Sequence, residues 1–320
     1  MLPEEKTKEK ILALLTVFLL FLFVGILFFS ISLNNKNKTE ILKRQVLKIK
    51  ADREMTAKLS QIQIATSSLP DLTSESFITL AITDNGAKKI LIQKNPDWAL
   101  PIASITKLMT AVVILENVNP ETKIKATRDY IGLKESAFIL ETDHFYTVKE
   151  LLANMLISSD NDSARLLSST LGEVNFVAKM NLKAQELNLT KTNYFNVTGL
   201  DPVRPDLNAN LSSPDDLANL LIYIKNKHPE ILNLTTNSSY NFCDIDNNCK
   251  LINSTDKFLS DKDFKFKIVG GKTGSTDLAK KNLVLMVEPV ANVTIINIVL
   301  GAKDNFVDTG SLINNIIINN

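Results

Sequence analysis

Ser104 and Lys107 are the first residues of this 320-residue chain whose types and spacing suggest chemistry, in the stretch "PIASITKLMTAVVILENV" that starts at position 101. Residues three apart on a helix face the same way, and the hydroxyl would lie near the positive N-terminal end. The segment that follows is apolar nearly all round, which predicts a buried helix. Burial lowers the pKa of a lysine, and a neutral amine can take the proton of a serine. The pair can therefore form an activated nucleophile, with a helix cap and a lysine that reaches solvent as the simpler alternative.

A second polar group occurs in "LISSDNDSARLL", where Ser159, Asp160 and Asn161 lie between two segments with helical periodicity. A hydroxyl and a carboxamide at such a junction can point into a cleft, relay a proton and hold a substrate amide. The same residue types also cap helices and form turns, so this stretch alone leaves both interpretations open.

A third group is Lys272, Thr273, Gly274 and Ser275 in "IVGGKTGSTD", on a predicted strand. Side chains alternate along a strand, so Lys272 and position 274 share a face. A glycine there lets a ligand lie against the backbone, while the lysine attracts a carboxylate. The stretch is not a phosphate loop, because nothing of the form G-x-x-x-x-G-K precedes Thr273. A glycine-rich strand end without a ligand is the alternative.

The elements that must position these groups follow from the sequence pattern. Two strands, at 77–83 and 88–93, are joined across Asn85 and Gly86, a pair typical of tight hairpins. The stretch from 103 to 235 is mostly helical, and strand character returns from 265 until a last helix, "NFVDTGSLINNIII". Strands at both ends with helices between them predict one α+β domain whose terminal strands share a sheet.

The N-terminal part predicts a membrane protein. Residues 11–33 are 23 residues without a charge, long enough for a transmembrane helix, with a cleaved signal peptide as the alternative. We therefore expect a short tail at 1–10, the span at 11–33, a juxtamembrane stalk and linker at 34–76 and the soluble domain at 77–320. Seven basic residues between 36 and 53, against three before the span, favour a cytoplasmic domain, but large domains translocate largely regardless of charge.

The composition and the two cysteines limit the partners and sites that can be expected. The net charge of +1 gives no indication of a nucleic-acid partner. A disulfide between Cys243 and Cys249 would fit an oxidising compartment, and two free thiols are equally open. No histidine or further cysteine accompanies them, so a metal site is not expected there.

The order S-x-x-K, S-D-N, K-T-G, on a helix, a helix junction and a strand, is the trio of β-lactamases and penicillin-binding proteins. The chain resembles the penicillin-binding D-alanyl-D-alanine carboxypeptidases of serine peptidase family S11 over about residues 77–310. The stretches "LPIASITKLMTAVVILE", "TVKELLANMLISSDNDSA", "NYFNVTGLD" and "GGKTGSTD" with "KNLVLMV" look like family segments. The resemblance implies a β-lactamase/transpeptidase-like fold with an antiparallel sheet.

The resemblance also implies the roles of the residues. Ser104 would be the acylated nucleophile and Lys107 its base, while Ser159 and Asn161 would relay protons and position the substrate. The terminal carboxylate would bind Lys272 and Thr273 beside Gly274, and the backbone N–H groups of Ser104 and Ser275 would form the oxyanion hole. The expected partners are the peptidoglycan pentapeptide ending in D-Ala-D-Ala and β-lactam antibiotics as covalent inhibitors, with no cofactor or metal. The expected location is the bacterial cell membrane, single-pass, with the domain outside the cytoplasm.

Three alternatives remain open. A class A β-lactamase needs a glutamate in an E-x-x-L-N stretch, where "AQELN" has Ala184 instead. A catalytically silent wall-binding protein would keep the fold, and Lys280, where the family usually has glycine, is the one local departure. A histidine-based hydrolase would use His144 or His228, which lie in segments predicted as loop or helix end.

Overall fold

The computed structural model describes residues 3–66, 70–132, 140–203 and 208–319, and the chain divides into two units. The first unit, residues 1–56, consists of most of helix α1 (Pro3–Gln61). The expected transmembrane span at 11–33 falls on this helix. More than half of the side chains of residues 11–33 are not among those that the structure describes. Among the residues that are described, no helix is both long enough and apolar enough to cross a membrane.

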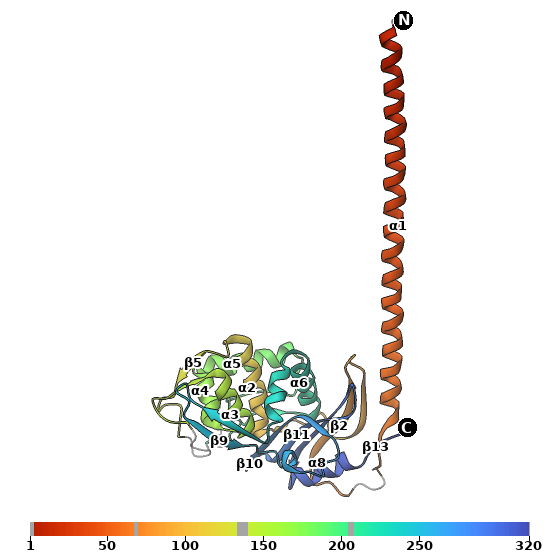
Figure 1. Cartoon of the computed structure of the whole chain (residues 1–320). Coiled ribbons are helices and arrows are strands. Elements are labelled where there is room, and N and C mark those ends of the chain that lie inside the picture. The colour runs from red at the N-terminus through yellow and green to blue at the C-terminus, as the bar shows by residue number, and fades with distance from the viewer. Residues whose placement is uncertain (1–2, 67–69, 133–139, 204–207, 320) are drawn as a thin grey trace. The chain divides into compact units, whose positions relative to one another are not determined.

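The second unit, residues 57–320, is built on a sheet of five antiparallel strands (Figure 1). Leu80 of a strand near the N-terminal end of this unit lies opposite Ile296 of a C-terminal strand, so the two ends of the domain share the sheet, as predicted. Gly86 has a φ of 89° in the turn between the first two strands, which a glycine adopts without strain. In spatial order the strands are β10 (Lys267–Thr276), β11 (Lys280–Val290), β12 (Val293–Ala302), β2 (Ser76–Thr83) and β3 (Lys88–Lys94).

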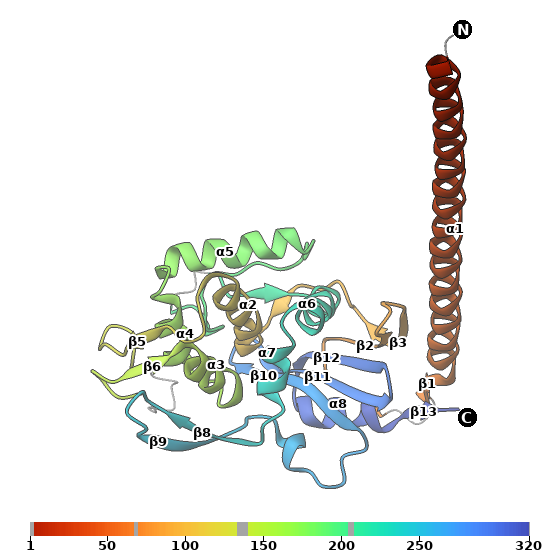
Figure 2. The ribbon, with the colours of Figure 1, turned by 45° about the horizontal axis from the view of Figure 1, so that its top comes forward.

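Both faces of the sheet are covered, which explains why every residue of β12 is buried. Side chains alternate along the strands, so Ile78 and Leu80 belong to the large core under the helical region, while Leu283 and Leu285 belong to a smaller core on the other face. Figure 2 shows α6 (Pro214–Lys227) and α8 (Asn305–Asn314) on opposite sides of the sheet. The sheet is therefore an inner layer of the domain.

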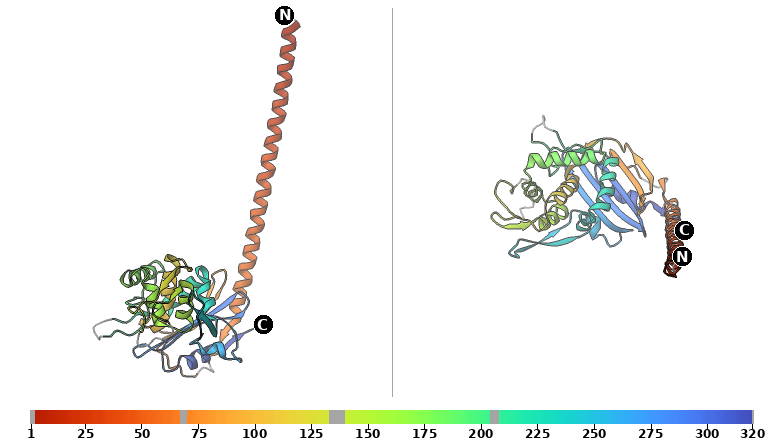
Figure 3. Two further views of the ribbon diagram at one scale, coloured as in Figure 1. Left: turned by 60° about the vertical axis from the view of Figure 1, so that its left-hand side comes forward. Right: turned by 90° about the horizontal axis from the view of Figure 1, so that it is seen from above.

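The helical region lies beside the blue strands of the sheet, in yellow to green in Figure 3. Its centre is α2 (Lys107–Asn117), whose residues from Lys107 to Ile114 are all buried, as the apolar sequence predicts. The helices that surround α2 are α3 (Val148–Ile157), α4 (Asn161–Ser168), α5 (Glu173–Glu186) and α7 (Pro229–Thr235).

The domain begins earlier than the residue 77 expected from the sequence. Strand β1 (Ile62–Ile64) pairs with β13 (Ile316–Ile318), and both Ile62 and Ile316 are buried in the smaller core. The expected last helix accordingly ends at Asn314, because the β-branched run that follows continues as β13.

A disulfide joins Cys243 and Cys249, which are direct partners across the hairpin of β8 (Ser239–Cys243) and β9 (Cys249–Asn253). Of the two alternatives that the sequence left open, the disulfide is therefore the one observed. The other small sheets pair β4 (Leu100–Pro101) with β7 (Leu211–Ser212) and β5 (Lys123–Lys125) with β6 (Phe145–Thr147).

Candidate active site

Ser104 and Lys107 lie where a short 3-10 helix, η2 (Ala103–Thr106), runs into α2. The N-cap residues of η2 and α2 are Ile102 and Thr106, so Ser104 is not the helix cap. The fully buried Lys107 donates from Nζ to Ser104 Oγ at 2.7 Å, to Asn161 Oδ1 at 2.6 Å and to the carbonyl oxygen of Thr198 at 3.0 Å. These contacts hold the amine beside the hydroxyl, within the range that proton transfer requires.

The loop that supplies the Thr198 carbonyl was given no role in the sequence argument. Asn196 Oδ1 accepts hydrogen bonds from the backbone N–H groups of Thr198 (3.1 Å) and Gly199 (2.6 Å), which folds the loop into a tight turn. The buried Asn210 donates to the carbonyl oxygen of Asn196 at 2.9 Å and to Thr106 Oγ1 at 2.9 Å, which ties the loop to η2. The local signal was an asparagine three residues before a glycine.

Ser159 and Asn161 lie at the junction of α3 and α4, as predicted. Ser159 has a φ of 64°, a left-handed conformation that turns the chain sharply between the two helices. Asp160 caps α4 by accepting from the backbone N–H of Ser163 at 2.7 Å, and its burial raises the pKa of its carboxyl group. The Ser159 hydroxyl accepts a hydrogen bond from Lys272 Nζ at 2.8 Å, while Asn161 contacts Lys107. The junction thus connects the two lysines of the motifs.

Lys272 is buried in β10, with 2% of its surface exposed. Burial holds the pKa of its ammonium group well below the usual value, and Lys107 would lower it further when protonated, whereas the carboxylate of Asp256 acts in the opposite direction. Besides Ser159, Lys272 donates to the carbonyl oxygen of Thr273 at 3.0 Å. Its contact with a substrate carboxylate stays a prediction.

Gly274 allows β10 to pass close to η2. A Cβ at this position would lie 2.7 Å from the carbonyl oxygen of Ile102 and 3.2 Å from the backbone nitrogen of Ser104. These neighbours belong to Ile102 and to the start of η2, and the expected contact of a ligand with Gly274, which also lines the cleft, stays a prediction. The close approach brings β10, including Ser275, alongside the start of η2, which carries Ser104.

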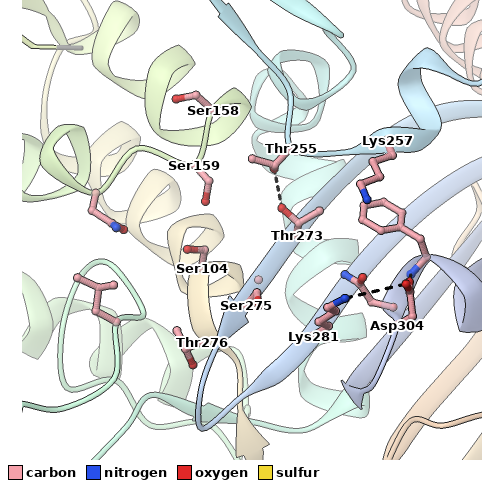
Figure 4. A pocket seen from close by; sticks show the side chains of 15 residues that line it. Ser104, Ser158, Ser159, Thr255, Lys257, Thr273, Ser275, Thr276, Lys281 and Asp304 are labelled. Carbon is pink, nitrogen blue, oxygen red and sulfur yellow. Dashed lines mark hydrogen bonds and ion pairs between the residues drawn. The ribbon is translucent and has the colours of Figure 1, made fainter. Parts of the chain in front are cut away.

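A cleft of about 470 Å³ opens over these groups. Figure 4 shows Ser104 and Ser159 at one end of it, Thr273 and Ser275 in the middle, and Lys257 and Asp304 at the other end. The described residues that line the cleft are Ser104, Ser158, Ser159, Asn161, Leu200, Thr255, Lys257, Thr273, Gly274, Ser275, Thr276, Lys281, Asp304, Asn305 and Phe306.

The residues on which the alternatives depend do not line the cleft. His144 contacts Asp244 at 2.6 Å and His228 contacts Glu116 at 3.2 Å, and neither histidine belongs to the lining. Ala184 is buried in α5, away from the lining as well. The histidine-based and class A β-lactamase alternatives therefore have no support here.

Lys280 occupies a backbone conformation that usually favours glycine, with a φ of 55°. Its ammonium group pairs with the carboxylate of Glu75 at 2.5 Å and is not part of the cleft lining. The departure from the family pattern at this position therefore leaves the described lining of the cleft unaltered.

The burial of Asp256 predicts that the stability of the domain depends on pH. Burial raises the pKa of this carboxyl group from 3.8 to about 6, against the effects of a hydrogen bond from Phe258 and the charge of Lys272. The folded protein therefore binds this proton more tightly than the unfolded chain does, and stability falls as the pH rises from about 4 to 6. At about 1.4 kcal/mol per pKa unit, the cost is of the order of 3 kcal/mol at most.

We expect Asp256→Asn to remove this cost. We compare the melting temperature of the variant with that of the unsubstituted protein at two pH values. In thermal unfolding experiments, the difference, variant minus unsubstituted protein, should be larger at pH 8 than at pH 4.5. The control Asp71→Asn changes an exposed carboxylate and should give the same difference at both pH values. A pH-independent difference for Asp256→Asn would contradict the raised pKa.

Comparisons with known proteins identify the family of this chain and several of its relatives. A family model described as D-alanyl-D-alanine carboxypeptidase, peptidase family S11, matches residues 63–304. The D-alanyl-D-alanine endopeptidase of Haemophilus influenzae is 33% identical over 217 residues, which are 67% of this chain and 70% of that protein. A D-alanyl-D-alanine carboxypeptidase of Mycobacterium tuberculosis is 28% identical over 68% of this chain and 71% of its own length. The aligned part covers only 31 to 53% of three other curated relatives.

Solved structures show the same fold. Penicillin-binding protein D2 of Listeria monocytogenes, in its ampicillin-bound form, has a TM-score of 0.66 and 28% identity over 77% of this chain and 98% of that one. A D-alanyl-D-alanine carboxypeptidase of M. tuberculosis has a TM-score of 0.66 and 26% identity over 76% of this chain and 88% of that one. Because the family model matches residues 63–304, most of the cleft-bearing domain, the chain is a serine peptidase that belongs to the D-alanyl-D-alanine carboxypeptidase family, S11.

Proposed function

We propose that this enzyme cleaves the D-alanyl-D-alanine bond of peptidoglycan stem peptides through an acyl-enzyme on Ser104. The observation that carries the proposal is the 2.7 Å contact between Ser104 Oγ and the buried Nζ of Lys107. As a neutral amine, Lys107 takes the proton of Ser104, and Oγ attacks the carbonyl carbon of the scissile amide. The C–N bond then breaks and the amine of D-alanine leaves. Water finally hydrolyses the ester and frees Ser104.

The oxyanion of the tetrahedral intermediate would accept hydrogen bonds from the backbone N–H groups of Ser104 and Ser275. The proposal is supported by the close approach of β10 to η2 at Gly274, which brings these two segments together. One such donor is typically worth about 10²- to 10³-fold in rate.

Ser159 and Asn161 would move the proton and hold the substrate. Their support is two contacts at the same helix junction, one between Asn161 Oδ1 and Lys107 and one between the Ser159 hydroxyl and Lys272. The Ser159 hydroxyl would pass the proton taken from Ser104 on to the leaving amine. Thr273, which lines the cleft, would hold the terminal carboxylate together with Lys272.

A fluorescent penicillin tests the acyl-enzyme directly, because a β-lactam acylates the serine of such a site and remains attached. We expect the domain to form a covalent adduct that Ser104→Ala abolishes, and mass spectrometry to show release of D-alanine from a defined pentapeptide. A domain that folds but forms no adduct would be a silent wall-binding protein instead.

We also propose that residues 11–33 hold the enzyme in the bacterial cell membrane with its domain outside the cytoplasm. The support is the uncharged run itself, exposed apolar side chains of α1 such as Phe18 and Phe21, and a disulfide typical of oxidising compartments. Cell fractionation tests this, since deletion of residues 1–33 should move the protein from the membrane to the soluble fraction.

A further inference from the structure

Asn154 is a fully buried polar residue in a helix whose other buried side chains are apolar. It lies in the last turn of α3, and the other buried residues of this helix are Val148, Leu151, Leu152, Ala153, Met155, Leu156 and Ile157. A buried carboxamide costs stability unless its oxygen and its nitrogen find hydrogen-bond partners, whereas a leucine at this position would simply add to the core. The partners of this carboxamide therefore indicate its role.

The carboxamide oxygen of Asn154 contacts the residue before Ser159. Ser158 Oγ donates to Asn154 Oδ1 at 2.7 Å and also lies 2.8 Å from the backbone carbonyl oxygen of Asn154. Ser158 is the C-cap residue of α3. In Figure 4 its hydroxyl points away from Ser104, whereas the hydroxyl of Ser159 points toward it. The contact with Asn154 thus fixes the chain on one side of Ser159.

The carboxamide nitrogen of Asn154 reaches the residue after Ser159 through another serine. Asn154 Nδ2 donates to Ser163 Oγ at 2.8 Å. The backbone N–H of Ser163 donates to Asp160 Oδ1 at 2.7 Å, and the Ser163 side chain forms a further hydrogen bond with this carboxyl group. Asp160 is the N-cap residue of α4. One buried amide therefore links the two helix ends that flank Ser159.

This link matters because the backbone of Ser159 is strained. Its φ of 64° is left-handed, and a residue other than glycine keeps such a conformation only where the surrounding structure fixes it. From this backbone the hydroxyl of Ser159 meets Lys272, and two residues later Asn161 meets Lys107. A shift of the junction would move both contacts at once, and a misplacement of about 1 Å can cost roughly 10²-fold in rate.

We propose that Asn154 is a positioning residue, whose carboxamide holds the junction of α3 and α4 so that Ser159 and Asn161 face the two lysines of the site. Asn154 does not line the cleft, so it acts through Ser158 and Ser163 and not on the substrate. This inference rests on the proposed acyl-enzyme function.

The rate of acylation by penicillin, measured together with thermal stability, tests this role. We expect Asn154→Leu to slow acylation about 10- to 100-fold. The variant should stay folded, because leucine has a similar volume and each serine keeps another partner, the backbone carbonyl of residue 154 for Ser158 and the Asp160 carboxyl group for Ser163.

The matched control is Leu152→Ala, which leaves a cavity in the same helix without removing a hydrogen bond. It should lower the melting temperature, while its acylation stays within twofold of normal at a temperature where all variants are folded. If Leu152→Ala were as slow as Asn154→Leu, the rate would follow packing and not the position of the junction, and the inference would be wrong.

Two milder variants test the same role if Asn154→Leu does not fold. At pH 5 a buried aspartic acid is neutral and offers a donor and an acceptor as the amide does, so Asn154→Asp should be acylated within threefold of the unsubstituted enzyme. Ser163→Ala removes only the bridging hydroxyl and should slow acylation about three- to tenfold. The double variant with Asn154→Leu should be no slower than Asn154→Leu alone, because both act through one link.

The possible failures of the two proposals are distinct. Normal acylation of either Asn154→Leu or Ser163→Ala would overturn the positioning role and leave the proposed function standing. Absence of a penicillin adduct on the unsubstituted enzyme would instead overturn the proposed function itself.

Discussion

Lys107→Met is expected to lower the rate of acylation by penicillin about 10²- to 10⁴-fold, the range that a positioned general base contributes. Methionine keeps the length and the apolar stem of lysine but has no basic group. Of the described contacts of Ser104 Oγ, the one from a basic group is that of Lys107 Nζ. The carboxamide of Asn161, which also contacts Lys107, cannot take the proton in its place.

The control for this prediction replaces both histidines. His144 and His228 pair with acidic residues outside the cleft lining, so the double variant should be acylated at the normal rate. Thermal unfolding of Lys107→Met shows whether the site remains folded. A double histidine variant that loses acylation, while Lys107→Met keeps it, would reject the assignment of lysine as the base.

The three motifs could be recognised from the sequence because their residue types carry the chemistry. Ser104, Lys107, Ser159, Asn161, Thr273 and Ser275 come from three distant segments, and the structure brings them together around one cleft or directly beneath it. The shared sheet was predictable for a similar reason, since its strands are strongly β-branched and lie at both ends of the domain.

The residues that hold the motif residues in place could not be predicted from the sequence in the same way. Asn196 and Asn210 hold the loop that contacts Lys107. The glycine three residues after Asn196 indicates a turn but not its contact with Lys107, and nothing local distinguishes Asn210 from the many other asparagines of the chain. The contact of Thr198 with Lys107 joins residues 91 positions apart, which no periodicity reveals. The sequence likewise indicates a turn at Asp256. Its burial next to β10, which raises the pKa of its carboxyl group, is seen only in the structure.

Gly199→Ala is expected to damage both the fold and the chemistry. Gly199 has a φ of 85°, which costs an alanine about 1 to 2 kcal/mol, and the added Cβ would lie 1.9 Å from the carbonyl oxygen of Ala103. Because the Cβ is fixed to the backbone of the loop and meets a backbone atom of η2, no side-chain rotation relieves the clash, and the loop must move away from η2. We expect a loss of more than about 3 kcal/mol in the free energy of unfolding, measured by denaturant titration.

The control variant Gly172→Ala separates the cost of a positive φ from the cost of the clash with Ala103. Gly172 has a similar φ of 77°, but a Cβ there would have no atom within 4 Å, so only the conformational cost applies. This control should lose about 1 to 2 kcal/mol and retain its acylation rate. In Gly199→Ala, displacement of the loop also withdraws the Thr198 carbonyl from Lys107, so acylation should slow even at temperatures where the variant is folded. If the two variants are equally stable and equally fast, the loop does not position the base.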